Sequence, residues 1–195
     1  MLTDELAIWL HDLALQTAGG PRWLLAGDAA LLALGVEGIS LPKELTLVCS
    51  GEDGGQLQAL LPAEAAIRIA PDPQLRFDGS SGALDLAAAW RHRSRFTIDG
   101  QTIAVLPLEY LLLSYLSTGD QQVAERIAGH LHQRGFDYAV IEDQIATIPA
   151  LEQAMVDVMQ KVVPLARRAA RRRAIRAAER KELEWFTRKS KPGDE

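Results

Sequence analysis

One stretch, "LLAGDAALLALGVEGISLPKELTLVCS", constrains the fold of this chain more than any other. Trp23–Ala26 is a short apolar run without a helical period, which predicts a buried strand, and Gly27 turns the chain. Asp28 is placed to cap a helix over Ala29–Leu34. The alternating residues Glu44–Ser50 predict a second strand. A strand, a glycine turn, a helix and another strand therefore open the fold.

Short strands continue through the centre of the chain. Four further segments have the composition of strands: 66–70, 83–87 (centred on Asp85), 96–98 and 102–105. The last two flank "DGQ", which is typical of a hairpin turn. The glycine-rich segment 51–55 and the turn-rich segment 71–82 are interpreted as loops. The centre of the chain is therefore predicted to be a small mixed sheet.

Helices are predicted on both sides of this centre. Apolar residues at helical spacing predict one helix over 2–16 and a short one over 56–62. From Pro107 onward the chain turns helical, with Pro where a first turn tolerates it. The predicted helices there are 108–117, 121–133, 138–146, 150–163 and 165–188. We therefore expect an α+β fold with flanking helices and a helical C-terminal half.

Composition places the chain among cytoplasmic globular proteins. Its 195 residues are 48% apolar, which suffices for a real core. The only cysteine, Cys49, lies in an apolar run, so no disulfide framework is expected and a reducing compartment is favoured. No apolar run approaches the ~20 residues of a membrane span, and the acidic start is unlike a secretory signal. We expect a soluble, cytoplasmic protein with no membrane partner.

Charge divides the chain into two parts. From Arg167 to the end there are eleven Lys and Arg against five Asp and Glu, a net +6. Because the whole chain carries −5, the residues before Arg167 carry −11. We therefore predict one domain over 1–148 and a helical extension over 149–195 that ends in a long basic helix.

The order of elements, with a glycine turn between two strands, resembles the minimal nucleotidyltransferase superfamily, most nearly its AbiEii-type members, over about residues 20 to 140. The resemblance implies a nucleotidyltransferase-like core. Gly27 takes the place of the family's glycine and Asp28 that of its Ser or Thr. Glu44 and Thr46 stand where the family has two aspartates one residue apart, and Asp85 is the candidate for the third carboxylate.

In that family the carboxylates hold two magnesium ions against a triphosphate, because hard cations prefer oxygen ligands and residues i and i+2 of a strand share a face. Here a neutral Thr46 hydroxyl replaces one carboxylate, which favours loss of activity. Asp28 adds an anion where polyphosphate should meet a helix start. The resemblance implies nucleotide binding by Gly27, Asp28 and Thr46.

The segment "LPLEYLLLSYLSTGD" carries the second part of the resemblance. It has the family's Pro-x-Glu start and leucine-rich helix, but Tyr115 stands near the family's lysine and Val123 near its later aspartate. The segment therefore keeps the family's sequence pattern, but residues of different chemistry stand at the lysine and aspartate positions.

Two functions follow. The first is a catalytically degenerate protein that acts by binding, as a regulator or adaptor, without a cofactor. The second is an active transferase that modifies a protein or RNA, with Glu44 and Asp85 as catalytic residues and ligands of one Mg²⁺. A structural interpretation also stands, in which Asp28 is a plain helix cap, Glu44 and Thr46 edge a strand, and Asp85 occupies a turn.

The basic C-terminal helix has three candidate roles. Arg168, Arg172, Arg176 and Arg180 are four residues apart and form one helical stripe. The stripe can contact nucleic-acid phosphates, dock on an acidic body of its own chain, a second copy or a protein partner, or remain solvated. The sequence does not choose among these roles. A second basic motif, "RHRSR" at 91–95, is interpreted as a hydrated loop, with a phosphate site as the alternative.

Overall fold

The computed structural model describes residues 4–62 and 65–163. Its sheet half contains α1 (Asp4–Gln16), β1 (Leu24–Ala26), α2 (Gly27–Ala33), β2 (Leu45–Cys49), α3 (Gly51–Leu60), β3 (Ile67–Pro71), β4 (Gln74–Phe77), β5 (Ser80–Ala83), α4 (Leu86–Arg91), β6 (Ser94–Ile98) and β7 (Gln101–Val105). The helical half contains α5 (Leu108–Thr118), α6 (Gln121–Arg134), the short 3-10 helix η1 (Tyr138–Val140), α7 (Glu142–Thr147) and a helix over 149–163. These two halves confirm the predicted α+β class.

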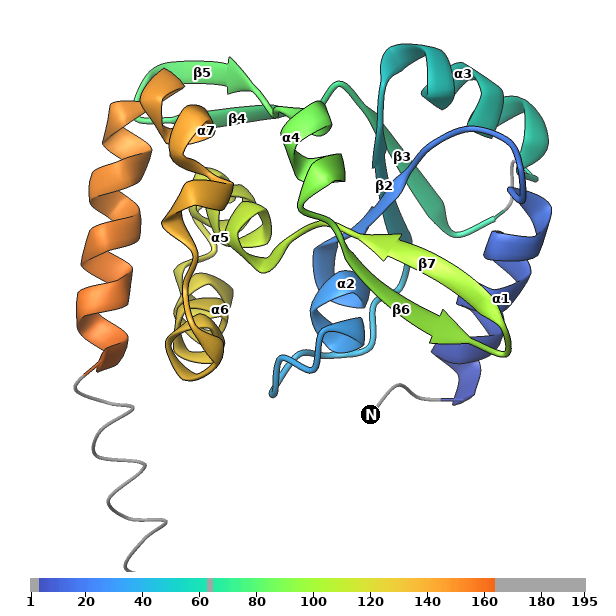
Figure 1. Ribbon diagram of the computed structural model, residues 1–195, viewed down its shortest axis with the longest axis horizontal. Helices are drawn as coiled ribbons and strands as arrows, with labels where there is room; N and C mark the ends of the chain where they lie inside the picture. Colours follow the sequence, from blue (N-terminus) through green and yellow to red (C-terminus); the bar gives the residue numbers. More distant parts are fainter. Residues whose placement is uncertain (1–3, 63–64, 164–195) are drawn as a thin grey trace, which may run out of the picture.

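Five strands form one mixed sheet in the order β3-β2-β1-β7-β6. β1 pairs antiparallel with β2 and parallel with β7, and β2 pairs parallel with β3. β6 and β7 form the predicted hairpin, whose turn residues Asp99 and Gly100 both have positive φ. Figure 1 shows α1 and α3 beside the sheet and the helices from α5 onward grouped at the other end of the molecule.

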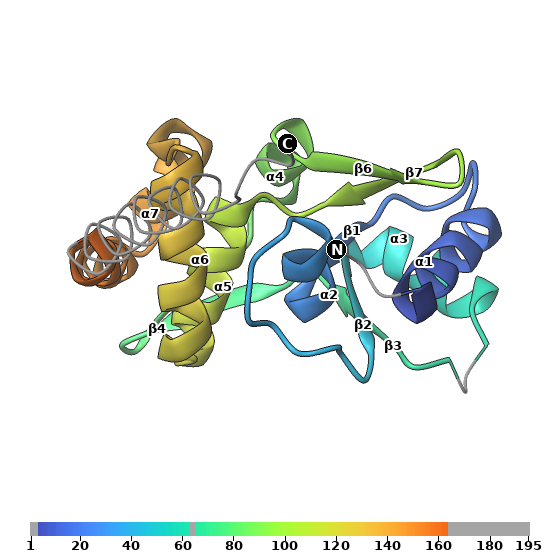
Figure 2. The same cartoon turned by 90° about the horizontal axis from the view of Figure 1, so that it is seen from below.

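One hydrophobic cluster joins the two halves. It includes Leu25 and Leu47 of the sheet, Leu111 of α5, and Leu151 and Val158 of the helix 149–163, all without measurable exposure. In Figure 1 the β4–β5 hairpin reaches from the sheet toward this last helix. Figure 2 shows α5 and α6 side by side between the sheet and this helix. The boundary between 148 and 149 stays a prediction, and the predicted basic helix 165–188 lies outside the described residues.

The glycine turn is built differently from the prediction. α2 begins at Gly27, its N-cap position is Ala26, and no side chain caps it. Asp28 lies in the first turn and is not the N-cap. Its carboxylate instead accepts a hydrogen bond from Tyr115, 87 residues away. The predicted cap was wrong because a distant hydroxyl competes with the local backbone N–H groups for the same oxygen.

Two predictions around glycine-rich segments were also wrong. Residues 51–55 begin α3, because the Ser50 hydroxyl accepts from the Asp53 backbone N–H and caps the helix. Gly54 lies so close to Pro71 that an added Cβ would stand 3.1 Å from the proline Cβ, so packing against β3 favours glycine here. The turn-rich segment 71–82 folds into the β4–β5 hairpin.

The predicted strand over 83–87 does not form. β5 ends at Ala83, and Asp85 is the N-cap of α4, where its Oδ1 accepts from the Ala88 backbone N–H. An Asp two or three residues before an alanine run is a typical helix start, which explains the helix in physical terms. Farther on, the single helix predicted over 138–146 is divided into η1 and α7.

Candidate functional site

A cavity of about 430 Å³ lies where the glycine turn, β2, β3 and α5 meet. Gly27, Asp28, Glu44 and Thr46, the four predicted residues of the glycine turn and second strand, all line it. Tyr115 of α5 also lines it. The sheet thus brings together residues that the sequence places in three separate segments.

Gly27 stands directly against Thr46. Its φ is +65°, a conformation that costs a residue with a Cβ about 1–2 kcal/mol. An added Cβ would also lie 3.3 Å from Thr46 Oγ1. Both the positive φ and the close approach of Thr46 therefore favour glycine here.

Asp28 is held by Tyr115 of α5. The Tyr115 hydroxyl donates to Asp28 Oδ1 at 2.6 Å, a short distance typical of a hydrogen bond to a carboxylate. Burial, this hydrogen bond and the charge of Asp28 raise the pKa of Tyr115 well above its usual range. The residue near the family's lysine position is therefore a neutral donor that fixes an anion at the glycine turn.

Arg68 is a site residue that the sequence analysis missed. It lies on β3 opposite Thr46 in the parallel register and lines the cavity together with Lys43. Its neighbours Ile67 and Ile69 face a different hollow, beside α3, as the alternation of a strand requires. The charged residue within the apolar segment "AIRIA" was the available signal, but only the register shows that it meets Thr46.

The carboxylates of the cavity are few and dispersed over separate elements. Those that line it are Asp28, Glu44 and Asp120, and Glu44 is exposed just before β2 begins. Asp120 caps α6 through the Val123 backbone N–H. Within 4–62 and 65–163, no three His, Cys, Asp or Glu side chains gather in a way that could hold a metal ion. The neutral Thr46 beside the guanidinium-bearing Arg68 does not fit a two-magnesium centre.

Asp85 is absent from the lining of this cavity, although its neighbour Leu84 is part of it. The Asp85 carboxylate caps α4, and its backbone N–H donates to Gln144 Oε1 at 2.6 Å. Gln144 is 2% exposed and also donates to the Ala83 carbonyl oxygen at 3.1 Å. The catalytic and metal-binding roles of Glu44 and Asp85 remain predictions.

The residues of the Pro-x-Glu segment have packing and hydrogen-bonding roles in the structure. Glu109 accepts from the Asp137 backbone N–H, and burial raises the pKa of its carboxyl. Val123 packs partly buried against the hydrophobic core. Neither residue is among those that line the cavity. The segment therefore positions Tyr115 through the helix it begins.

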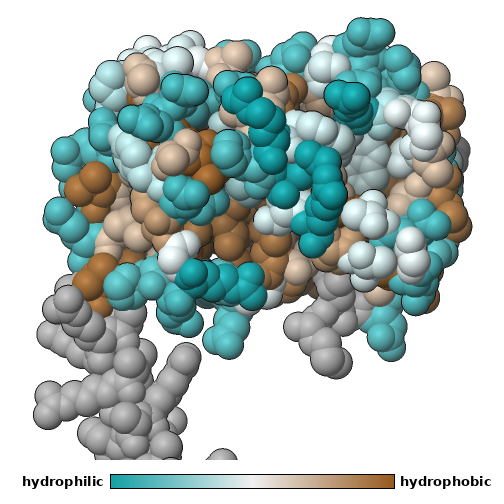
Figure 3. All heavy atoms as spheres, viewed as in Figure 1, coloured by the Kyte–Doolittle hydropathy of each residue, from teal (hydrophilic) through white to brown (hydrophobic). Residues whose placement is uncertain are grey.

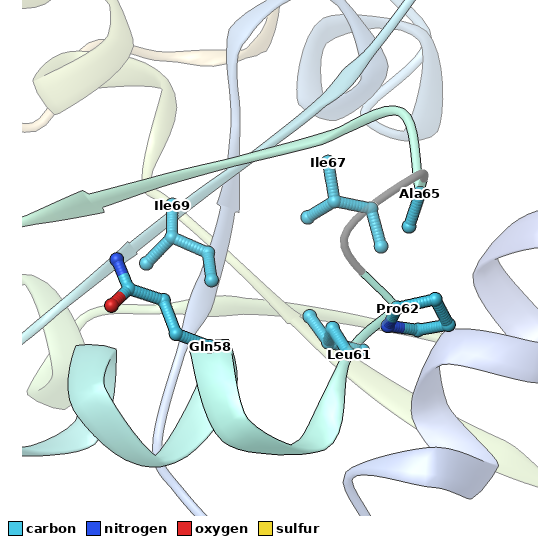
Figure 4. A pocket seen from close by; sticks show the side chains of 6 residues that line it. All are labelled: Gln58, Leu61, Pro62, Ala65, Ile67 and Ile69. Atoms are coloured by element: carbon cyan, nitrogen blue, oxygen red, sulfur yellow. The ribbon is translucent and has the colours of Figure 1, made fainter.

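A smaller hollow of about 210 Å³ lies between α3 and β3 (Figure 4). Its lining is Gln58, Leu61, Pro62, Ala65, Ile67 and Ile69. None of these six side chains titrates, so this lining supplies no acid, base or nucleophile. The predicted stripe Arg168, Arg172, Arg176 and Arg180 lies outside the described residues.

Comparison with known proteins supports the fold. No protein-family model and no curated protein matches the chain. A crystal structure described as a "putative nucleotidyltransferase (TM1012) from Thermotoga maritima" is similar to it, with a TM-score of 0.52 and 18% sequence identity. The similarity covers 68% of this chain and 96% of that one. No helix among the described residues is long and apolar enough to cross a membrane.

At this low identity the similarity bears on architecture alone. The five-stranded mixed sheet, the glycine turn at its centre and the flanking helices are those of a nucleotidyltransferase-like fold, and this chain has that fold.

Proposed function

We propose that this protein is a catalytically degenerate relative of the AbiEii-type minimal nucleotidyltransferases, which acts by binding as a regulator or an adaptor. The observation that carries the proposal is the pair Thr46 and Arg68, side by side on the cavity face of β2 and β3. A guanidinium stays charged at any physiological pH and repels a divalent cation. A threonine hydroxyl does not replace a bridging carboxylate.

The same cavity is suited to an anion without a metal. Lys43 and Arg68 line it, and the ion pairs identified among the described residues do not include either of them. Two cations beside a hollow of about 430 Å³ can receive the phosphates of a nucleotide directly. Asp28 opposes this attraction, but its carboxylate is already bonded to Tyr115 and is fixed in place. We therefore infer metal-independent nucleotide binding in this cavity, with the phosphates at Lys43 and Arg68 and the rest of the site formed by Gly27, Thr46 and the Tyr115-bonded Asp28.

Calorimetric titration with ATP tests the binding step. We expect binding to persist in EDTA and to weaken at least tenfold in Arg68→Gln, because one charge-assisted contact is worth about 1.5–3 kcal/mol. Arg134→Gln, an exposed arginine in the last turn of α6, is the matched control and should bind as the unaltered protein does. Binding that requires Mg²⁺ and survives in Arg68→Gln would contradict the proposal.

Transfer activity is tested separately. Incubation with each radiolabelled nucleoside triphosphate, Mg²⁺ or Mn²⁺ and a cell extract should label no protein or RNA. Thr46→Asp, alone and combined with Arg68→Gln, places a carboxylate on β2 and tests whether the rest of the site can then support transfer.

The alternative function, an active transferase with Glu44, Asp85 and one Mg²⁺, makes the opposite prediction. Because Asp85 caps α4, Asp85→Ala removes both a charge and a helix cap. Asp85→Asn removes the charge and keeps a good cap, so it separates catalysis from folding. Label transfer that disappears in Asp85→Asn, with unchanged thermal stability, would establish the alternative and overturn the binding proposal.

A further inference from the structure

A second cavity, of about 450 Å³, lies on the same face of the sheet as the candidate site. Val48 lines both cavities, and Leu24 and Ala26, which share a face of β1, line one each. The second cavity is also lined by Arg22, Trp90 and Arg91. In the view of Figure 1, α4 stands in front of the sheet, and Figure 3 shows strongly hydrophilic side chains gathered over that region.

Arg22, Arg91 and Arg93 lie around Trp90, and Arg95 lies near enough to Arg93 for its charge to act on that guanidinium. We call these four residues the arginine cluster. The Arg93 guanidinium carbon lies 4.4 Å from the centroid of the Trp90 ring, and that of Arg22 lies 5.8 Å from it. Arg93 also donates to the Trp90 carbonyl oxygen. Stacking on an aromatic ring orders a guanidinium in advance, so less entropy is lost when it binds a ligand.

The cluster carries positive charge that the described part of the chain does not neutralise. The one ion pair identified there joins Lys161 to Glu125. Asp53, the acidic residue of the second cavity, accepts from the Arg22 backbone N–H and from the Ser50 hydroxyl. Burial lowers the pKa of Arg93, and the neighbouring positive charges of Arg95 and Arg22, which repel its guanidinium, lower it further. An oxyanion between them would relieve this repulsion.

We propose that the arginine cluster binds the phosphate groups of a single-stranded nucleic acid, with an unpaired base entering the cavity beside Trp90. Several guanidinia spread from the segment before β1 to β6 fit successive phosphates better than one small anion. A hollow beside an indole and Leu86 suits the flat, partly apolar face of a base. A duplex keeps its bases stacked and cannot place one there. The linings of the two cavities share only Val48, and this proposal does not depend on the proposed nucleotide binding.

Fluorescence anisotropy with labelled 20-nucleotide single strands, and with the matching duplex, tests this site on the full chain. We expect Arg22→Gln/Arg91→Gln/Arg93→Gln to weaken single-strand binding at least tenfold. Its log–log salt slope should become shallower by about 2, since each phosphate contact contributes about −0.7 for single strands. Arg76→Gln, an exposed arginine on β4, is the matched control.

Two further variants keep the test decisive. Arg91→Gln leaves in place both the stacking of Arg93 on Trp90 and the hydrogen bond from Arg93 to the Trp90 carbonyl oxygen. A loss of affinity in this variant therefore cannot come from the loss of those contacts. A variant with Arg168, Arg172, Arg176 and Arg180 changed to glutamine reports on the C-terminal stripe, and we expect it to keep most single-strand binding. Unchanged binding in the triple variant, or duplex binding as tight as single-strand binding, would overturn the proposal. Titration of the triple variant with ATP reports on the nucleotide site, so failure of the arginine-cluster proposal can be told apart from failure of the proposed nucleotide binding.

Discussion

Gly27 and its neighbours show how single residues define the candidate site. Gly27 permits both a positive φ and the close approach of Thr46, while Tyr115 holds Asp28 from another element. These two arrangements are local, and each can be removed by one substitution.

Gly27→Ala is expected to lower the free energy of unfolding by about 2–3 kcal/mol, because a positive φ alone costs a Cβ-bearing residue about 1–2 kcal/mol and the contact with Thr46 adds to it. Gly19→Ala is the matched control, since Gly19 has φ +71° and an added Cβ there meets nothing within 4 Å. Urea denaturation of both variants measures the difference. Equal losses would show that Thr46 does not crowd this position.

Tyr115→Phe is expected to destabilise the fold by about 1–2 kcal/mol at neutral pH, because it removes a hydrogen bond to a carboxylate. The pKa of Tyr115 is raised in the folded state, so its contribution is complete below about pH 10, the usual value, and is lost as the pH rises further. The stability gap between the two proteins should therefore narrow above pH 10, by up to about 1.4 kcal/mol per pH unit.

Denaturation at several pH values up to 11 measures this gap. Tyr138→Phe gives the exposed comparison: its hydroxyl bonds Glu152 on the surface, and that bond also raises the pKa of Tyr138, so a gap that narrows in the same direction but by less is expected there. A gap that stays constant through pH 11 would contradict the account of Tyr115.

At the level of elements, Gln144 of α7 connects parts of the chain that lie about sixty residues apart. Its side chain accepts from the Asp85 backbone N–H at the start of α4 and donates to the Ala83 carbonyl oxygen at the end of β5. The helical half thereby fixes the connection between the hairpin and α4, where Leu84 lines the first cavity and Leu86 the second. A buried amide with both groups satisfied is costly to remove.

Gln144→Ala is expected to cost about 2–4 kcal/mol, because it leaves two backbone groups without partners and opens a void. Gln153→Ala, which loses only an exposed hydrogen bond to Asp157, should cost less than about 0.5 kcal/mol. Thermal unfolding of both variants gives the comparison. A small loss in Gln144→Ala would mean that water replaces the amide.

At the level of the whole molecule, charge separation is the dominant feature. The residues before Arg167 carry −11 and the remainder +6, yet the arginine cluster places positive charge on the acidic part as well. The C-terminal stripe and the cluster are thus two candidate anion sites of different kinds, one periodic along a predicted helix and one assembled around an indole.

The stripe Arg168, Arg172, Arg176 and Arg180 is expected to show its role in salt titrations with duplex DNA. If it contacts phosphates, the log–log slope should be about −4 to −5, because each B-DNA phosphate contributes about −0.9. If it docks on an acidic body, deletion of 165–195 should change the mass in light scattering or the stability, with negligible duplex binding in both forms. No binding at 50 mM salt and an unchanged mass would leave a solvated helix.

The sequence by itself determined the elements whose causes are local. The apolar run before Gly27, the alternation of "ELTLVCS", the "DG" hairpin and the leucine-rich helix after Pro107 each depend on residues a few positions apart, and all were confirmed. The resemblance carried by Gly27, Glu44 and Thr46 was enough to predict the nucleotidyltransferase-like fold.

Only the tertiary structure decided the chemistry of the site, because that chemistry depends on partners far apart in the chain. Asp28 has the local signature of a helix cap but bonds Tyr115, and Asp85, predicted on a strand, caps α4 and meets Gln144. Arg68 becomes a site residue through the register of β3 on β2. A one-residue shift would turn it to the other face, and no local pattern sets that register.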